Sequence, residues 1–341
     1  MDKVFVLVAG YFSTGSSAVV DFLKEFNNTF ECKAEIRMIK DPYGICALDQ
    51  ELFSGHWNAA RASNAIWDFI DISKKWCRYG KTPFSPFGFS YKHFLNKQYM
   101  NLTYDYVSKI TSCTDRVDTY SDMSKKSYLR YVFDRNRRYL EKKTKGRIRI
   151  ANRRVRQDYL CKPSEQQFLH ATKEYLLKLF TTGECNPDKK FILLDQAIPA
   201  NDPLLCQRYF DNAKMIIVDR DPRDVFVDNM LWTDFLINNP NSEEEAKKFC
   251  DFFLAYRANN AIISSNILRV QFEDLINHYN EKTVEIMEFL GLKAEDHTEP
   301  LRFFNPSFSK KNVGIWVKYY SKFNKAIDYI QVHLKDYIYE R

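Results

Sequence analysis

Four short runs of apolar, often β-branched residues limit what this 341-residue chain can fold into more than any other feature. Each run is followed by a turn and then by a segment with the apolar spacing of a helix. Runs of this kind are typical of parallel strands that are buried on both faces, and their alternation with helices predicts an open sheet covered on both sides. The runs are Val4–Ala9, Phe191–Leu194, Met215–Val218 and Ile267–Val270.

Helices are expected after these strands and at the C-terminal end. Pro222 suits the first turn of a helix, and Gly291 suits the residue that ends one. The clearest helical segments are Ser17–Phe26, Glu165–Phe180, Pro222–Ile237, Glu243–Ser264, Glu281–Leu290 and Val317–Tyr339.

Between residues 56 and 182 no convincing strand appears, and we interpret this stretch as a helical insertion. The chain is therefore expected to form a single α/β domain over residues 1–341. Its core comprises residues 1–55 and 183–341, and the insertion 56–182 leaves the edge of the sheet where substrates of open α/β sheets bind.

Charge is unevenly distributed along the chain. The net charge is +7, yet residues 125–156 alone hold fourteen Lys and Arg against Asp134 and Glu141. Such a segment either attracts anionic partners or forms a solvated helix face. Aromatic residues interleave with this run, but no nucleic-acid-binding motif accompanies it, so nucleic acid is not an expected partner.

No window of eighteen uncharged apolar residues occurs, so no membrane span is expected. The first apolar run is too short for a signal peptide, and we therefore expect a cytoplasmic protein. The eight cysteines are far apart and form no CxxC pair. They are expected to be reduced thiols, and no metal site is predicted.

The segment Gly10-Tyr-Phe-Ser-Thr-Gly-Ser-Ser17 lies between the first strand and the first helix and has the G-x-x-x-x-G spacing of a phosphate-binding loop. Glycines allow backbone N–H groups to turn toward an anion, and a helix N-terminus adds its positive end. The loop lacks the lysine that NTP-hydrolysing loops carry, and a plain turn capped by Ser16 is the alternative. The residues expected to bind the phosphorylated ligand are Ser13, Thr14, Gly15, Ser16 and Ser17.

Arg220 directly follows the strand Met215–Val218 and the residue Asp219, and it precedes the helix that begins at Pro222. An arginine at the carboxyl end of a strand is well placed to bind a phosphate through two nitrogen atoms. Arg223 and Asp224 either belong to the same site or form an ion pair at the start of the helix.

In the same order along the chain, these segments resemble motifs of the sulfotransferases that use 3′-phosphoadenosine 5′-phosphosulfate (PAPS). Gly10–Ser17 is similar to their 5′-phosphosulfate loop, and Arg220–Asp224 is similar to their RxPRD segment at the 3′-phosphate. Three further stretches fit the family, and the resemblance covers about residues 1–45 and 186–320. They are Asp195–Asn201, Arg269–Leu275 continuing to Glu288–Leu292, and Lys310–Trp316.

The resemblance implies a P-loop-like α/β fold, PAPS as donor and adenosine 3′,5′-bisphosphate (PAP) as product. It also implies that the glycine loop binds the 5′-phosphosulfate, while Arg220, Lys310 and Lys311 hold the 3′-phosphate. No metal is implied, because backbone amides and basic side chains handle the sulfuryl group.

Residues 32–39 resemble the stretch after the first helix of tyrosylprotein and glycan sulfotransferases. There a carboxylate acts as base, which assigns that role to Glu35, with Arg37 assisting. A carboxylate whose pKa is raised by burial takes a proton well from a hydroxyl group. In an extended strand Arg37 would lie on the same side and steady the transferring group. The alternative is an ordinary Glu/Arg pair on a surface strand.

Two positions depart from the family pattern. Ser13 stands where the family loop carries a cation, whose loss typically costs a few kcal/mol of transition-state stabilisation. Either Lys40 or a residue of the basic segment 125–156 replaces that cation, or the protein is slow or inactive. Asp228 stands where a serine is expected, and it repels a 3′-phosphate unless Lys310 and Lys311 offset it or Asn229 donates instead.

The sequence therefore predicts a sulfotransferase that moves a sulfuryl group from PAPS to an acceptor hydroxyl. The abundance of Lys, Asn, Ile, Phe and Tyr is typical of AT-rich microbial genomes, so a bacterial source and a glycan or other envelope acceptor are expected. Two alternatives remain: a catalytically inactive nucleotide- or glycan-binding protein of the same fold, and a nucleotide-type kinase. The acceptor and the oligomeric state do not follow from the sequence.

Overall fold

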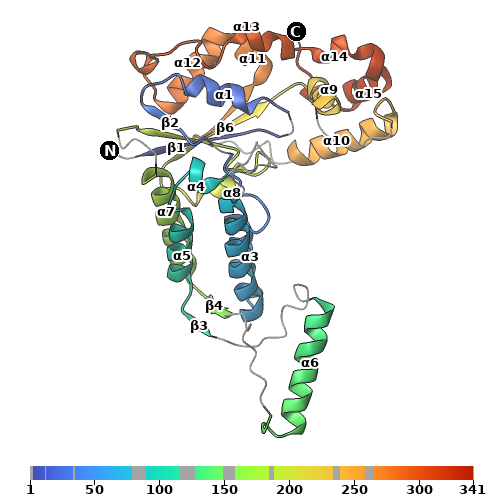
Figure 1. Cartoon of the computed structure of the whole chain (residues 1–341). Coiled ribbons are helices and arrows are strands. Elements are labelled where there is room, and N and C mark those ends of the chain that lie inside the picture. Colours follow the sequence, from blue (N-terminus) through green and yellow to red (C-terminus); the bar gives the residue numbers. More distant parts are fainter. Residues whose placement is uncertain are drawn as a thin grey trace.

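The computed structural model describes residues 3–11, 13–33, 35–78, 90–115, 127–148, 158–183, 188–232, 239–257 and 264–340. A five-stranded sheet with the order β2-β5-β1-β6-β7 lies at its centre (Figure 1). All four strand pairs of this sheet are parallel. The strands are β1 (Val4–Ala9), β2 (Thr29–Glu31), β5 (Phe191–Asp195), β6 (Ala213–Asp219) and β7 (Ile267–Gln271).

The four strands expected from apolar runs are all present, each extended by no more than two residues at an end. The edge strand β2 was not predicted. It is only three residues long, Thr-Phe-Glu, and pairs with β5 alone. A strand this short and polar leaves no apolar run in the sequence.

Strand β1 shows why the sheet needs helices on both faces. Val6 and Val8 point into one buried cluster, whereas Phe5 and Leu7 point into the other, as the two-residue period of a strand requires. The first cluster is closed by α1 (Ser16–Leu23), α11 (Phe272–Asn277) and α12 (Tyr279–Leu290). The second is closed by α2 (Ile45–Phe53), α8 (Pro203–Gln207), α9 (Pro222–Trp232), α10 (Glu243–Arg257), α15 (Tyr320–His333) and the helices between α2 and β5 apart from Tyr128–Lys143. The predicted α/β fold, with a mostly parallel sheet flanked by helices, is confirmed.

The helices between α2 and β5 extend away from the sheet (Figure 1). Tyr106 of α5 and Tyr175 of α7 stack with ring centroids 4.8 Å apart, and Tyr106 exchanges a 3.0 Å hydrogen bond with Thr172. These contacts join the antiparallel helices α5 and α7 into one helical layer. The helices are α3 (Ala59–Arg78), α4 (Tyr91–Phe94), α5 (Tyr99–Ile110), α6 (Tyr128–Lys143) and α7 (Glu165–Thr181).

The expectation that residues 56–182 hold no strand is wrong. β3 (Cys113–Asp115) and β4 (Asp158–Leu160) form a two-stranded antiparallel sheet at the end of the helical layer. Each strand has three residues, too few to show an alternating pattern. α6 stands apart from the other elements at this end of the molecule (Figure 1).

Helix ends follow local chemistry. Gly291 ends α12 with φ 69°, as expected for a C-terminal glycine. The residue before α1 is Gly15 with φ 88°, so the alternative in which Ser16 caps this helix is wrong. The expected continuations of α9 and α10 over residues 233–237 and 258–263 lie outside the described residues.

The C-terminal segment differs from the single helix expected over Val317–Tyr339. It forms α14 (Ile315–Lys318), then α15, which is kinked at Phe323, and then the 3₁₀ turn η4 (Lys335–Tyr337). The short elements before it are η2 (Ala294–Asp296), α13 (Pro306–Ser309) and η3 (Lys310–Asn312). None of the described helices combines the length and the apolar character needed to span a bilayer.

Candidate functional site

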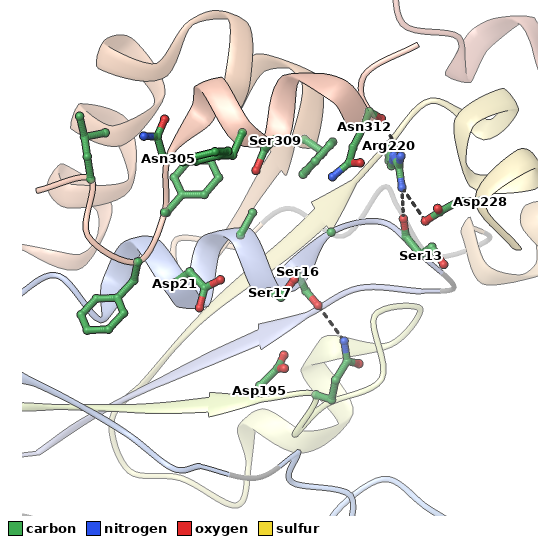
Figure 2. A pocket seen from close by; sticks show the side chains of 18 of the residues that line it. Ser13, Ser16, Ser17, Asp21, Asp195, Arg220, Asp228, Asn305, Ser309 and Asn312 are labelled. Carbon is green, nitrogen blue, oxygen red and sulfur yellow. Dashed lines mark hydrogen bonds and ion pairs between the residues drawn. The ribbon is translucent and has the colours of Figure 1, made fainter. Parts of the chain in front are cut away.

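A cavity of about 570 Å³ opens beyond the carboxyl ends of the central strands (Figure 2). This is where open parallel sheets bind their ligands, because the loops that follow neighbouring strands meet there. The loop after β1 and the start of α1 form one wall, the end of β5 forms a second, and the segment 301–312 forms a third. The polar and charged lining residues include Ser13, Ser16, Ser17, Asp21, Glu35, Asp195, Gln196, Arg220, Asp228, Arg302, Asn305, Ser309 and Asn312.

The loop after β1 turns sharply at Gly15. Its φ of 88° and its neighbour Phe272, whose ring would lie 2.6 Å from an added Cβ, leave room for glycine only. This turn brings Ser13, Ser16 and Ser17 to the cavity, where the N-terminus of α1 also lies. Thr14 takes a different role: it is buried, and its Oγ1 accepts a 3.2 Å hydrogen bond from the backbone N–H of Tyr11. Of the predicted loop, Phe12 lies outside the described residues.

Arg220 connects three parts of the cavity wall and is only 4% exposed. Its Nη1 donates to the carbonyl oxygen of Ser13 at 2.6 Å, and its Nη2 donates to that of Asn312 at 2.7 Å. Nη1 also forms an ion pair with Asp228 Oδ2 at 3.1 Å. The carboxylate of Asp228 therefore holds a position on the guanidinium that a phosphate oxygen would take. Asn229, considered from the sequence as a donor, donates instead to the carbonyl oxygen of Val225.

Arg223 and Asp224 support the wall from behind and do not line the cavity. Arg223 pairs with Asp221 at 2.7 Å, so the helix-start ion pair exists but with a different acid from the one expected. Asp224 accepts hydrogen bonds from the backbone N–H groups of Gly314 and Trp316 at 2.6 and 3.0 Å. Burial raises the pKa of Asp224 to about 6.

The predicted 3′-phosphate ligands Lys310 and Lys311 are exposed and do not line the cavity. Their neighbours Ser309 and Asn312 do line it, so this segment reaches the cavity without its two lysines.

Glu35 lines the cavity, but its side chain is 55% exposed, so the burial expected for a proton acceptor is absent. The reason is that residues 35–37 continue past β2 as irregular backbone, with Tyr91 Oη bridging the N–H of Arg37 and the carbonyl oxygen of Glu35. Arg37 does not line the cavity. Its Nε binds Asp41 at 2.6 Å, and its Nη1 lies 3.6 Å from Glu35.

Asp195 is a cavity residue that the sequence placed only in a turn. Burial, with a smaller contribution from the charge of Glu35, raises the pKa of Asp195 to about 6. Its Oδ1 has no hydrogen-bond partner within the described ranges. Its position as the last residue of a buried run, at the carboxyl edge of the sheet, was the available sequence signal.

Gln196 and Lys40 join this part of the site. Gln196 Nε2 donates to Ser16 Oγ at 2.9 Å, and Figure 2 marks this hydrogen bond with a dashed line at Ser16. Lys40 Nζ donates to Gln196 Oε1 at 2.9 Å. Gln196 itself was not expected at the site, whereas Lys40 was one of two suggested replacements for the missing loop cation.

Acidic groups outnumber basic groups on the described cavity wall. Asp21, Glu35, Asp195 and Asp228 line it, against Arg220 and Arg302. No lysine lines it within the part of the chain that the structure describes. In that same part, no cluster of three or more His, Cys, Asp or Glu side chains is arranged to hold a metal ion.

Comparison with solved structures finds several sulfotransferases with low sequence identity. The sulfotransferase domain of the olefin synthase from Synechococcus PCC 7002 is 12% identical, with 100% of this chain and 96% of that chain covered, at a TM-score of 0.40. The sulfotransferase STF1 from Mycobacterium tuberculosis is 11% identical, with 92% and 76% covered, at 0.36. The sulfotransferase domain from the curacin biosynthetic pathway is 11% identical, with 98% and 97% covered, at 0.37. Because these TM-scores are below 0.5, the fold is assigned from the strand order of the sheet and not from these similarities.

No curated protein matches the chain. A family model does: residues 203–296 match that of the sulfotransferase family. The matched residues begin at α8 and run through β6, Arg220, α9 and β7 to Asp296, the last residue of η2. They thus include Arg220, which lines the cavity, and this stretch of the chain is similar to the sulfotransferase family.

Proposed function

We propose that this protein transfers a sulfuryl group from PAPS to a hydroxyl group of its acceptor. One observation carries the proposal: the glycine loop after β1 and Arg220 after β6 meet at a single cavity, where Arg220 Nη1 donates to Ser13 O at 2.6 Å. A loop suited to bind one phosphate thus lies beside an arginine suited to bind another. A nucleotide with an anionic group at both its 5′ and 3′ positions matches this pair.

In the proposed complex, Gly15, Ser16 and Ser17 bind the 5′-phosphosulfate. Arg220 binds the 3′-phosphate after Asp228 has turned away, and Lys310 and Lys311 approach from the segment that contains Asn312. The acceptor oxygen then forms a bond to sulfur while the bond from sulfur to the 5′-phosphate oxygen breaks. The electron pair of the broken bond stays on PAP, and the proton of the acceptor passes to a carboxylate.

Glu35 is the proposed proton acceptor, because it lines the cavity that the glycine loop and Arg220 also line. Arg37 would hold the backbone around Glu35 in place through its ion pair with Asp41 rather than touch the sulfuryl group itself. The acceptor is proposed to be a carbohydrate that also contacts the helical layer of residues 56–182. A cytoplasmic location and a bacterial source remain predictions from the sequence.

Binding of PAP tests the proposal, measured by calorimetry at low salt beside ATP and AMP. Arg220→Gln should weaken PAP binding at least about tenfold, since it removes a buried charge-assisted contact. Asp228→Ser should strengthen PAP binding by about tenfold and leave AMP binding unchanged, because only PAP has a 3′-phosphate to compete for Arg220. Arg61→Gln, an exposed arginine paired with Glu51, is the matched control. Wild-type protein without measurable affinity for PAP would sink the proposal.

The surplus of carboxylates on the cavity wall favours a second candidate, a nucleotide-binding protein that no longer catalyses transfer. Four described carboxylates face two arginines, one of which already pairs with Asp228. This candidate predicts PAP binding without turnover of radiolabelled PAPS, and no difference between wild type and Glu35→Gln. Turnover in the wild type that Glu35→Gln reduces would exclude it.

A further inference from the structure

Among the described residues, the cavity wall holds only two cations, Arg220 and Arg302. Arg220 is engaged by Asp228 and two carbonyl oxygens, and Arg302 is 61% exposed and paired with Glu299. Near Ser16, the described lining consists of hydroxyl, amide and carboxyl groups. A leaving phosphate oxygen at this place would develop negative charge without a neighbouring positive group.

Lys40 is connected to Ser16 through hydrogen bonds. It donates to Gln196 Oε1 at 2.9 Å, and Gln196 donates to Ser16 Oγ at 2.9 Å, so two bonds connect its ammonium group to a hydroxyl of the loop. Lys40 is partly buried, yet within the described ranges no carboxylate oxygen lies within ion-pair distance of its Nζ. A partly buried ammonium group without a paired carboxylate is unfavourable unless it acts on something else.

Gln196 is held in the bridging position by its backbone. Its φ of 57° places it in the left-handed region, which costs a residue other than glycine energy and persists only where surrounding contacts enforce it. The enforcing contact is its N–H, which donates to the carbonyl oxygen of Val8 at 2.8 Å. The strained turn therefore keeps the amide between Lys40 and Ser16, a bridge that an ordinary turn after β5 would not provide.

We infer that Lys40, acting through Gln196, supplies the positive charge that Ser13 does not, and so stabilises the leaving 5′-phosphate oxygen during transfer. The inference rests on the proposed function. When the sulfur–oxygen bond breaks, its electron pair stays on the phosphate, and the Lys40–Gln196–Ser16 chain points positive charge toward that oxygen. Lys40 is a positioning residue in this scheme, because it acts through the amide of Gln196.

The test compares Lys40→Met, Lys40→Arg and the double variant Lys40→Met with Gln196→Lys. Lys40→Met keeps the length of the side chain and removes its charge, so kcat with PAPS should fall about 10- to 100-fold while PAP affinity changes less than about threefold. Lys40→Arg should retain most of kcat. The double variant should recover activity, because Gln196 lines the cavity and a lysine there brings the charge back directly.

The pH profile separates charge from structure. Burial lowers the pKa of Lys40 from the usual lysine value, opposed by the carboxylates of Asp41, Glu35 and Asp195 and assisted by Arg37. The wild-type kcat should therefore decline as pH rises through that lowered pKa, whereas Lys40→Arg should keep its kcat over the same range. A merely structural lysine would produce no such difference.

Lys214→Met serves as the control, because Lys214 is partly buried at the opposite end of β6. It should leave kcat and PAP affinity unchanged. If Lys40→Met does not fold, Gln196→Leu breaks the same bridge and should lower kcat to a similar extent.

The outcomes distinguish the two proposals. A wild type that neither binds PAP nor turns over PAPS contradicts the proposed function. A wild type that does both, together with a Lys40→Met or Gln196→Leu variant of undiminished kcat, contradicts only the role of Lys40. A loss of kcat that Gln196→Lys fails to restore in a folded double variant also overturns that role.

Discussion

Asp195 is a carboxyl group that the fold holds where its ionised form is unfavourable. It ends β5, lines the cavity and faces Glu35, and its Oδ1 has no hydrogen-bond partner within the described ranges. Its pKa is about 6 in the folded chain, above the value of about 3.9 for an unperturbed aspartate. Between these two pH values the folded state therefore binds more protons than the unfolded state.

A pH-dependent loss of stability follows. Because the excess protons are bound by the folded state, the free energy of unfolding should fall as pH rises from about 4 to about 6, by about 2 kcal/mol for this group. Asp195→Asn should remove that part of the decline. Urea unfolding gives the free energy of unfolding of wild type and variant at pH 4 and at pH 7. The difference between the two proteins should change between these pH values, and the titration of Asp224 and other shared groups cancels in that difference.

The control for this measurement is Asp211→Asn, an exposed carboxylate paired with Lys173. If the difference between Asp195→Asn and wild type changes with pH no more than the difference between Asp211→Asn and wild type, the raised pKa of Asp195 is refuted.

At the scale of elements, α9 and α14 are joined through one carboxylate. Asp224, in the first turn of α9, accepts two N–H groups at the start of α14, and α14 follows directly on the residues that form a cavity wall. Arg223 adds to this joint, because its guanidinium lies 4.1 Å from the ring centroid of Trp316.

Asp224→Ala should therefore lower the free energy of unfolding by about 2 kcal/mol or more, since it leaves two backbone donors without their acceptor. PAP affinity should fall too, because the carbonyl oxygen of Asn312 that binds Arg220 belongs to the same segment. Asp224→Asn keeps one acceptor oxygen and should lose about half as much stability. Unfolding curves and PAP titrations of the three proteins test this, and equal stability of Ala variant and wild type would contradict it.

The sequence predicted those elements whose signal is local. β1, β5, β6 and β7 are continuous apolar runs, and Gly291 is a helix-ending residue, so each could be recognised alone. The start of α14 at Ile315 could not be predicted in this way, because the N–H groups there are bound by Asp224, ninety residues before Gly314. A tertiary contact supports that start.

The same distinction holds for the candidate site. The loop at Gly15 and the arginine at 220 are sequence patterns, and the structure places both at the cavity. The bridge from Lys40 through Gln196 to Ser16 joins three separate segments, and the strained backbone of Gln196 leaves no signal in its residue type. The exposure of Glu35 likewise depends on the irregular backbone beyond β2.

At the scale of the whole molecule, the cavity and α6 lie at different ends (Figure 1). Residues 127–148 hold eight Lys and Arg against Asp134 and Glu141, so most of the net charge of +7 is concentrated around α6. α6 stands at the end of the helical layer away from the sheet, and α3, with 20 residues, spans roughly 30 Å between them (Figure 1). The exposed face of α6 also presents Tyr128 and Leu129, which are 78% and 79% exposed.

Only a long acceptor could contact both places at once, and the positive charge of α6 favours an anionic one. Reversing the exposed charges Arg135, Lys142 and Lys143 to Glu should therefore raise the KM for a uronic-acid polysaccharide about tenfold or more. The KM for its disaccharide and the affinity for PAP should not change, because neither ligand reaches α6. The same reversal at the exposed residues Lys247, Lys248 and Lys293 should affect none of the three values. Equal effects on polymer and disaccharide would show that α6 does not bind the acceptor, whereas an effect confined to the polymer would place the acceptor chain along the helical layer.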